Sequence, residues 1–468
     1  MPPPLALQEL SAVTTVITDP DLLRGYERDE ADLCASGTPM AVVRPRTTSE
    51  VSAIVRIAAA HGIPVVPQGA RTGLAGAANA LDGAIVVSMT GMDRIVEVDA
   101  VNRIAVVEPG VVNARLAAAV AESGLRYPPD PGSWESSTIG GNVSTNAGGM
   151  CCVKYGVTSA YVLELEVVLA DGKVLRCGRR TAKGVAGYDL ARLFVGAEGT
   201  LGIITEITVA LRPAAEPGLT LAATFPTVAA AGAAVTAIVT AGATPSMLEL
   251  IDRTHLGAIE AYRPMGLDAS DGAQPTALLL AAVDTGGRAA DDIAKLGALC
   301  DAAGATDTFT ASDADEAAAL LAARRLAHPA MERLAYTMYG DGGGLIIDDV
   351  AVPVSHLADM IEGVEKISAE SGVAVGMIGH AGDGNLHPII VIDRRDDANV
   401  AAGRRVFDAI LALGLSLGGT VTGEHGVGLL KREWLETELG PVGLRVHRAI
   451  KQALDPANIM NPGKVIAN

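Results

Sequence analysis

The sequence has few of the features that mark secreted, nucleic-acid-binding or membrane proteins. Its five cysteines are too scattered for a disulfide framework and none forms a CxxC pair, so a reducing cytoplasm is the expected location. Acidic residues outnumber basic ones, 54 against 36, and the net charge of −18 opposes binding to nucleic acid or to an anionic membrane surface. Small solutes are the partners that this charge balance favours.

Neither a secretory signal nor a membrane-spanning hydrophobic run is expected. The N-terminus, MPPPLALQEL, has neither a basic start nor an apolar core of sufficient length. No charged residue occurs between Glu216 and Glu249, but Pro226 and Pro245 bracket the middle of this stretch, which is mostly Ala, Thr and Gly. A buried strand and helix are therefore expected there, and not a membrane span.

What the chain does have is apolar material for more than one folded core. At 468 residues, with 49% hydrophobic and 19% charged residues, it is too long for a single core and too apolar for general disorder. The clearest boundary is RPAAEPG at 212–218, because two prolines and a glycine interrupt any helix or central strand. At least two domains are expected.

The part before this boundary alternates short strands and helices. A helix is expected from Thr48 to Gly62, strands over 84–89, 94–100 and 103–110, and a hairpin at Asp171-Gly172. After the boundary the order over 219–310 is β-α-β-β-α-β, which is typical of the ferredoxin-like arrangement. A helix over 312–334, strands near 345–352 and 373–380, a strand in PIIVI and C-terminal helices follow, so the fold class is α+β.

Three glycine-rich stretches, at 67–76, 130–149 and 195–205, are candidates for binding a dinucleotide. Glycine lets backbone N–H groups approach a pyrophosphate, and neighbouring hydroxyls donate to phosphate oxygens. Neither GxGxxG after a strand nor GxxxxGK[ST] occurs in this region, which argues against a Rossmann NAD site or a P-loop. Taken singly, each stretch is also explained by glycines that only make turns.

The stretch GHAGDGNLH at 379–387 places two histidines on either side of a turn. His380 ends one apolar run and His387 begins the next, so a hairpin brings the two imidazoles together. In GEHG at 423–426, Glu424 and His425 add a carboxylate and an imidazole. Two histidines and one carboxylate suit Zn, Mn or Fe(II), although two ordinary histidines at the neck of a hairpin explain GHAGDGNLH equally well.

Taken together and in order, these motifs resemble a known family. PVVPQGARTGLAGAANA, PPDPGSWESSTIGGNVSTNAGG and YDLARLFVGAEGTLGIITE are similar to the FAD-binding domain of the vanillyl-alcohol oxidase or PCMH type. With GHAGDGNLH, GEHGVG and DPANIMNPGKV, the chain resembles the branch that contains the flavin subunit of glycolate oxidase, D-lactate dehydrogenase and D-2-hydroxyglutarate dehydrogenase. The resemblance implies a PCMH-type FAD domain of two subdomains over 1–213, a ferredoxin-like antiparallel-sheet cap domain that takes the substrate over 214–420, and a helical segment over 421–468 that returns to the FAD site.

The resemblance also implies which residues surround FAD. Because the first loop contains Arg71 and no histidine, non-covalent FAD is expected. The residues carried over by their match to the family's motifs are Gln68, Gly69, Ala70, Arg71, Thr72, Gly73, Pro131, Gly132, Ser137, Thr138, Gly141, Asn142, Ser144, Thr145, Glu198, Gly199, Ile204 and Asn461.

For the chemistry, the resemblance makes His380, His387 and Glu424 ligands of a divalent metal, with zinc first and manganese or iron as alternatives. It makes His425 the catalytic base and Arg324 the cation for the substrate carboxylate, a role for which the planar guanidinium is suited. A solvated charge beside Arg325 is the alternative for Arg324. The implied reaction is oxidation of a D-2-hydroxy acid to the 2-oxo acid by hydride transfer to flavin N5.

Three departures from the hydroxyglutarate enzymes bear on the substrate. Those enzymes have a threonine where this chain has His328, a lysine near Ile347 and an asparagine at Ile389. Isoleucine cannot hold a second carboxylate, so a monocarboxylate such as lactate or glycolate is expected. D-2-hydroxyglutarate dehydrogenase and an alkyldihydroxyacetone-phosphate synthase remain alternatives. A quinone, a cytochrome, an electron-transferring flavoprotein or oxygen is the expected electron acceptor, and a homodimer the expected assembly.

Overall fold

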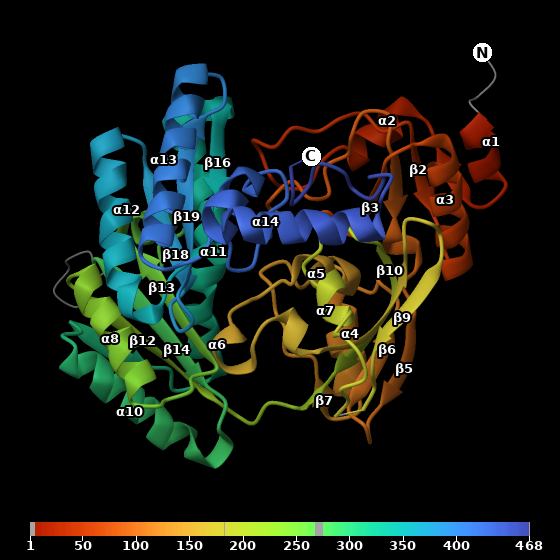
Figure 1. Cartoon of the computed structure of the whole chain (residues 1–468). Helices are drawn as coiled ribbons and strands as arrows, with labels where there is room; N and C mark the ends of the chain where they lie inside the picture. Colours follow the sequence, from red (N-terminus) through yellow and green to blue (C-terminus); the bar gives the residue numbers. More distant parts are fainter. Residues whose placement is uncertain (1–4, 182, 267–274, 468) are drawn as a thin grey trace. The chain divides into compact units, whose positions relative to one another are not determined.

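The computed structural model describes residues 5–181, 183–266 and 275–467, which fold into two compact units (Figure 1). Met1–Gly149, Gly156–Ala214 and Glu424–Asn468 form the first unit, and Met150–Tyr155 and Ala215–Gly423 form the second. Both units combine helices with antiparallel sheets, and the first unit also has one small, mainly parallel sheet. The expected α+β class is therefore confirmed. Among the described helices, none combines the length and the apolar character needed to cross a bilayer.

The first unit contains a small, mainly parallel sheet in the order β1-β2-β4-β3. Helix α3 (Thr48–His61) begins at the N-cap Thr47, whose side chain accepts from the Glu50 N–H, and ends where Gly62 takes a left-handed conformation. Its buried face, which includes Val51 and Ile54, packs in one core with this sheet. The strands are β1 (Thr15–Ile17), β2 (Ala41–Arg44), β3 (Val65–Gln68) and β4 (Ile85–Ser88).

A second, antiparallel sheet of the first unit has the order β5-β6-β10-β8-β9. The expected hairpin at Asp171-Gly172 is confirmed: it joins β8 to β9, and Gly172 has a φ of 78°. The strands are β5 (Ile95–Asp99), β6 (Ile104–Val107), β8 (Val162–Val168), β9 (Val174–Gly178) and β10 (Ile203–Ala210), with β7 (Leu125–Arg126) and β11 (Arg212–Pro213) paired separately.

The helices of the first unit are mostly short. The last one, α14 (Leu435–Leu454), leaves helical geometry at Gly440, directly before Pro441. The others are α1 (Leu5–Ser11), α2 (Pro20–Leu23), α4 (Asn113–Ala121), α5 (Ile139–Thr145) and α7 (Ala191–Phe194).

The second unit is built on one sheet in the order β15-β12-β14-β13-β18-β19-β16. Numbered along the chain, its first four strands have the spatial order 4-1-3-2 of a ferredoxin-like sheet, and β18, β19 and β16 extend it. The strands are β12 (Leu219–Phe225), β13 (Met247–Asp252), β14 (Ala277–Val283), β15 (Asp307–Thr310), β16 (Gly343–Ile347), β17 (Val350–Ala351), β18 (Val375–His380) and β19 (Asn385–Asp393).

Helices cover both faces of this sheet. Along β19, Ile389 and Val391 join the apolar cluster beneath two helices, whereas a Cβ at Gly403 would touch Ile390 and Ile392 on the other face. The helices over the first face are α9 (Arg253–Tyr262) and α11 (Ala314–Tyr339); those over the second are α8 (Val228–Thr240), α10 (Ala289–Ala302), α12 (Leu357–Ser371) and α13 (Asp397–Ser416), and α6 (Cys152–Tyr155) also belongs to this unit.

Two local expectations for this unit need correction. Helix α9 was not expected between the second and third strands; Asp252 caps it by accepting from the His255 N–H, and Leu256 and Ile259 bury its apolar side. The strand expected over 345–352 is divided into β16 and β17. At the break, Asp348 donates its N–H to the Pro388 carbonyl of β19 at 2.8 Å, but Pro388 has no N–H to return a bond.

Candidate functional site

The three glycine-rich stretches lie together within the first unit. Gly69 sits so close to the second stretch that a Cβ there would be 2.4 Å from Thr138 Oγ1. The third stretch joins the second through Glu198, whose N–H donates to the Ser144 carbonyl at 2.8 Å. Segments that the sequence separates by more than a hundred residues therefore form one region, as a shared ligand requires.

The C-terminal segment reaches the same region. The amide nitrogen of Asn461 donates to the carbonyls of Ala77 (2.9 Å) and Glu198 (2.8 Å), so it lies between the first and third stretches. Lys464 donates to the carbonyls of Gly76 and Asn79, which holds the loop after the first stretch. Asn461 thus occupies a position consistent with closing the expected FAD site.

Four of the residues expected around FAD carry a buried polar atom that no hydrogen bond satisfies within the described structure. They are Gln68 Oε1, Ser137 Oγ, Asn142 Nδ2 and Asn461 Oδ1. Buried polar atoms are nearly always hydrogen-bonded in proteins, so such a group calls for a ligand or water. FAD offers phosphate oxygens, ribose hydroxyls and flavin ring atoms, which are the partners that these donors and acceptors need.

Glu198 holds the loop that carries Glu424 and His425. Its two carboxylate oxygens accept from the N–H groups of Val427 (2.7 Å) and Gly428 (2.8 Å). Burial raises the pKa of Glu198 to about 7, although these two bonds and Lys464 act in the opposite direction. The resemblance placed Glu198 among the residues around FAD, and the structure adds that its carboxylate holds the loop that carries Glu424 and His425.

Glu424 and His425 lie at a bend against the second glycine stretch. Gly426 has a φ of 85°, a conformation that favours glycine, so the chain turns there. Gly148 has no side chain and so leaves room for the Glu424 carboxylate. A Cβ at Gly148 would be only 2.2 Å from Glu424 Oε2. His425 Nε2 lies 3.8 Å from Glu424 Oε1, so the carboxylate and the imidazole stay together within the first unit.

In the second unit, the hairpin of β18 and β19 brings His380 and His387 together. His380 pairs with Asn385 and His387 pairs with Ile378, so the two histidines are diagonal neighbours on one face of the sheet. Their ring centroids are 5.1 Å apart and the rings meet edge to face, at 82°. The expected juxtaposition of two imidazoles is therefore present in the structure.

His380 contacts a buried carboxylate that the sequence analysis did not single out. Glu249 of β13 is the cross-strand partner of His380, and its Oε1 lies 2.6 Å from His380 Nδ1. Its Oε2 accepts from Arg324 Nε at 2.7 Å. Burial alone would raise the pKa of Glu249, but His380 and Arg324 outweigh it and hold this pKa below its ordinary value.

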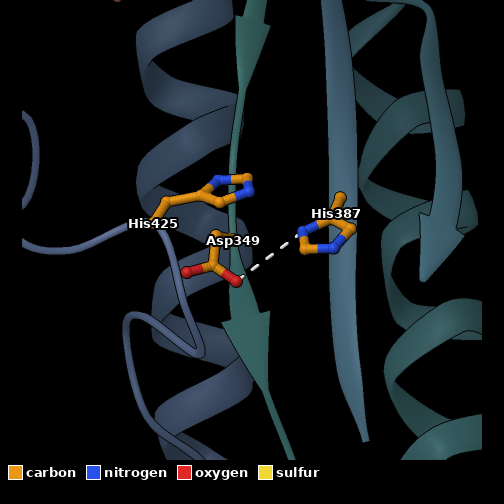
Figure 2. A group of neighbouring side chains, drawn as sticks. All are labelled: Asp349, His387 and His425. Carbon is orange, nitrogen blue, oxygen red and sulfur yellow. Dashed lines mark ion pairs between the residues drawn. The ribbon is translucent and has the colours of Figure 1, made fainter. Parts of the chain in front are cut away.

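His387 has a second buried carboxylate beside it, Asp349, which follows β16. Asp349 Oδ1 lies 3.6 Å from His387 Nδ1, the ion pair that Figure 2 marks with a dashed line. This distance exceeds a hydrogen bond. The Asp349 oxygens accept from Asn385 Nδ2 (2.6 Å) and Thr422 Oγ1 (2.7 Å). Acidic residues within or directly after an apolar strand, as in MLELID and GLIIDDV, are the signal that would have found both carboxylates.

The two histidines suit the imidazole part of a metal site. An imidazole that donates its Nδ1–H to a carboxylate carries its lone pair on Nε2, the usual arrangement of metal-bound histidine. His380 has this arrangement, because Glu249 Oε1 lies 2.6 Å from its Nδ1, whereas the Asp349 carboxylate lies 3.6 Å from His387 Nδ1, beyond a hydrogen bond. Two adjacent imidazoles are suitable donors for a divalent cation. Glu424, the third expected ligand, belongs to the first unit.

Arg324 and His328 lie one helical turn apart on α11. The Arg324 side chain is 19% exposed, and Glu249 takes its Nε–H. The guanidinium still presents its two Nη groups, which suit a carboxylate. The His328 side chain is 51% exposed and lies 3.5 Å from Glu332 Oε1, so it belongs to a wetter face of the helix than Arg324.

Two protein families match this chain, one before and one after the boundary near residue 214. Residues 39–178 match the family described as "FAD binding domain", and residues 215–465 match the family described as "FAD linked oxidases, C-terminal domain". "Glycolate oxidase subunit GlcD" of Bacillus subtilis is 43% identical over 430 residues, 92% of this chain and 89% of the relative. "D-lactate dehydrogenase" of Anaerostipes hadrus is 32% identical and covers 96% of this chain, with 94% of the relative matched.

A solved structure, p-cresol methylhydroxylase with substrate bound, superposes with a TM-score of 0.80 at 20% identity, over 99% of this chain and 96% of that protein. At this identity the likeness concerns the fold alone. The expected PCMH-type fold with a sheet-containing second domain is thus confirmed.

Proposed function

This chain belongs to the family of FAD-linked oxidases, and we propose that it oxidises a D-2-hydroxy monocarboxylate, lactate or glycolate in kind, to the 2-oxo acid. The FAD-binding family match and the four buried polar atoms that lack partners support bound FAD. The relatives named for glycolate oxidase and D-lactate dehydrogenase support the class of substrate. Non-covalent attachment follows from Arg71 in the first loop.

The observation that carries the proposal is the network of Arg324, Glu249 and His380 on one face of the second unit. Arg324 and His380 contact the two oxygens of one buried acid, which supports a carboxylate-binding cation and a metal-binding imidazole side by side. A 2-hydroxy acid needs this combination, because its carboxylate and its hydroxyl lie on adjacent carbons.

In the proposed reaction, Arg324 binds the substrate carboxylate through its Nη groups and so orients the α-carbon. His380, His387 and Glu424 hold a divalent cation, zinc first, with manganese and iron as alternatives. His425 accepts the proton of the substrate hydroxyl as general base. When bound, the cation supplies a Lewis acid for that hydroxyl and FAD supplies the hydride acceptor at N5.

The proposal that the substrate has only one carboxylate rests on Ile347 and Ile389. These two residues are direct cross-strand partners on β16 and β19, and both contribute to the apolar cluster beneath α11. A second carboxylate placed among such residues would lose its hydration without gaining a partner. This favours lactate or glycolate over 2-hydroxyglutarate.

Several further proposals rest on the sequence. The division into an FAD-binding part (1–213), a cap (214–420) and a returning segment (421–468) is retained. A cytoplasmic location, a homodimer, and a quinone, cytochrome, electron-transferring flavoprotein or oxygen as electron acceptor complete the proposal.

An anaerobic screen of flavin reduction tests the function. D-lactate and D-glycerate, glycolate, D-2-hydroxyglutarate and the L-enantiomers are mixed with the oxidised protein, and the flavin absorbance is followed. Stoichiometric bleaching by a D-monocarboxylate or glycolate, with slower reduction by the dicarboxylate and the L-acids, is expected. Faster reduction by D-2-hydroxyglutarate would overturn the substrate assignment, and no reduction by any of these acids would overturn the reaction.

A further inference from the structure

Glu249 is an unusual residue for the middle of a sheet. Its side chain is 0% exposed, and it lies on β13 between the buried residues Leu248 and Leu250. A buried carboxylate is costly unless hydrogen bonds and opposite charge compensate it. An apolar residue at this position would extend the neighbouring core, so the acid calls for a specific role.

The two oxygens of Glu249 serve two different residues. Oε1 lies 2.6 Å from His380 Nδ1, on the neighbouring strand, and Oε2 lies 2.7 Å from Arg324 Nε, on α11. The bond to Nδ1 keeps the imidazole in one orientation, and the bond to Nε restricts rotation of the planar guanidinium. One side chain therefore orients both groups.

We propose that Glu249 is a positioning residue that couples metal binding to recognition of the substrate carboxylate. This inference rests on the proposed function of His380 and Arg324. Accepting the Nδ1–H of His380 leaves the lone pair on Nε2 and makes the imidazole a stronger ligand. Accepting the Nε–H of Arg324 directs the Nη groups, so the metal site and the carboxylate site keep a constant separation, as a 2-hydroxy acid requires.

Asp349 does not duplicate this role. It lies 3.6 Å from His387 Nδ1, and Asn385 and Thr422 donate to its oxygens. An amide and a hydroxyl thus hold the Asp349 carboxylate, whereas Glu249 contacts both a guanidinium and an imidazole, so the coupling is assigned to Glu249.

The test is a Glu249→Gln variant of the FAD-loaded protein. A glutamine accepts from one partner only and turns an NH₂ donor toward the other, so both groups cannot remain oriented. Zinc affinity, measured by competition with a chromophoric chelator, is expected to fall about 10- to 100-fold. The apparent Kd of the acid that reduces the flavin, taken from the concentration dependence of reduction, is expected to rise about 10-fold or more, as for loss of a charged hydrogen bond.

Asp252→Asn is the matched control. Asp252 lies on the same strand, is buried, and pairs with a histidine, since its Oδ1 lies 3.0 Å from His255 Nδ1. Neither residue belongs to the proposed site, so zinc affinity and the acid Kd are expected to stay within about twofold of wild type, as for independent sites. A loss in the control as large as that in Glu249→Gln would show that any buried acid of this strand has the same effect, and would overturn the inference.

Two outcomes separate this inference from the proposed function. If wild-type protein binds zinc and Glu249→Gln binds zinc and acid as tightly as wild type, the positioning role is wrong and the proposed function stands. If wild-type protein binds no zinc, manganese or iron, the metal site itself is wrong and the inference falls with it.

A measurement on wild-type protein covers the case in which Glu249→Gln does not fold. In metal-free protein with ¹⁵N-labelled histidine, the His380 signals are assigned by their loss in His380→Gln. The ¹⁵N NMR chemical shifts of His380 are expected to be those of an imidazole that carries a proton on Nδ1. A His380 ring protonated at Nε2 alone would overturn the inference.

Discussion

Replacing Gly148 with alanine perturbs the proposed site through a single methyl group. A Cβ at Gly148 would lie 2.2 Å from Glu424 Oε2 and 3.1 Å from Glu424 Cβ, whereas ordinary contacts begin at 3.4 Å. The Glu424 carboxylate must therefore move by about 1 Å (3.4 − 2.2 = 1.2 Å). The φ of Gly148 lies outside the left-handed region, so the backbone itself accepts alanine.

The expected magnitude follows from the geometry of metal binding. Ligand distances must lie within about 0.2 Å of their preferred values, so a carboxylate displaced by about 1 Å no longer serves as a ligand without distortion. Because a misplacement of about 1 Å can cost about 100-fold, zinc affinity should fall about 10- to 100-fold. FAD content should be retained, since Glu424 is not among the residues expected around FAD.

Chelator competition measures the zinc affinity, and the flavin absorbance of the purified protein measures the FAD content. Gly25→Ala in the same unit is the control, because nothing lies within 4 Å of a Cβ at Gly25. Zinc affinity in Gly148→Ala equal to that in Gly25→Ala would refute the reasoning, as would loss of FAD with unchanged zinc affinity.

The remaining predictions concern the base, the ligands and the effect of pH. His425→Ala should keep FAD and metal while flavin reduction slows at least ~100-fold, and near-normal reduction would exclude His425 as base. His380→Ala and Glu424→Ala should each lower the metal content found by elemental analysis; a metal-free wild-type protein purified without chelators would contradict this. The raised pKa of Glu198, about 7 against 4.5, means that its contribution to stability is fully present below about pH 4.5 and is lost as the pH rises through about 7. Chemical unfolding followed by flavin fluorescence should show this fall in wild-type protein and a flatter profile in Glu198→Gln; equal slopes would contradict the assignment.

Local chemistry was readable from the sequence because its causes lie within a few residues. Glycine, aspartate and asparagine between two apolar runs predicted the hairpin that brings His380 and His387 together, and Asp171-Gly172 predicted the turn between β8 and β9. The order of strands and helices after residue 218 likewise predicted a ferredoxin-like sheet. Each of these features depends on backbone conformations and side-chain periodicity that short segments specify.

The tertiary structure decided which distant residues meet. Glu249 contacts His380, 131 positions further along the chain, because the sheet places β13 beside β18. Glu198 similarly meets Val427 and Gly428 only after the C-terminal segment returns to the first unit. No local pattern specifies such pairs, because they follow from strand order and from the buried location of a charge. The sequence by itself therefore determined the turns, the strands and the reactive residue types, and the fold decided which carboxylates orient them.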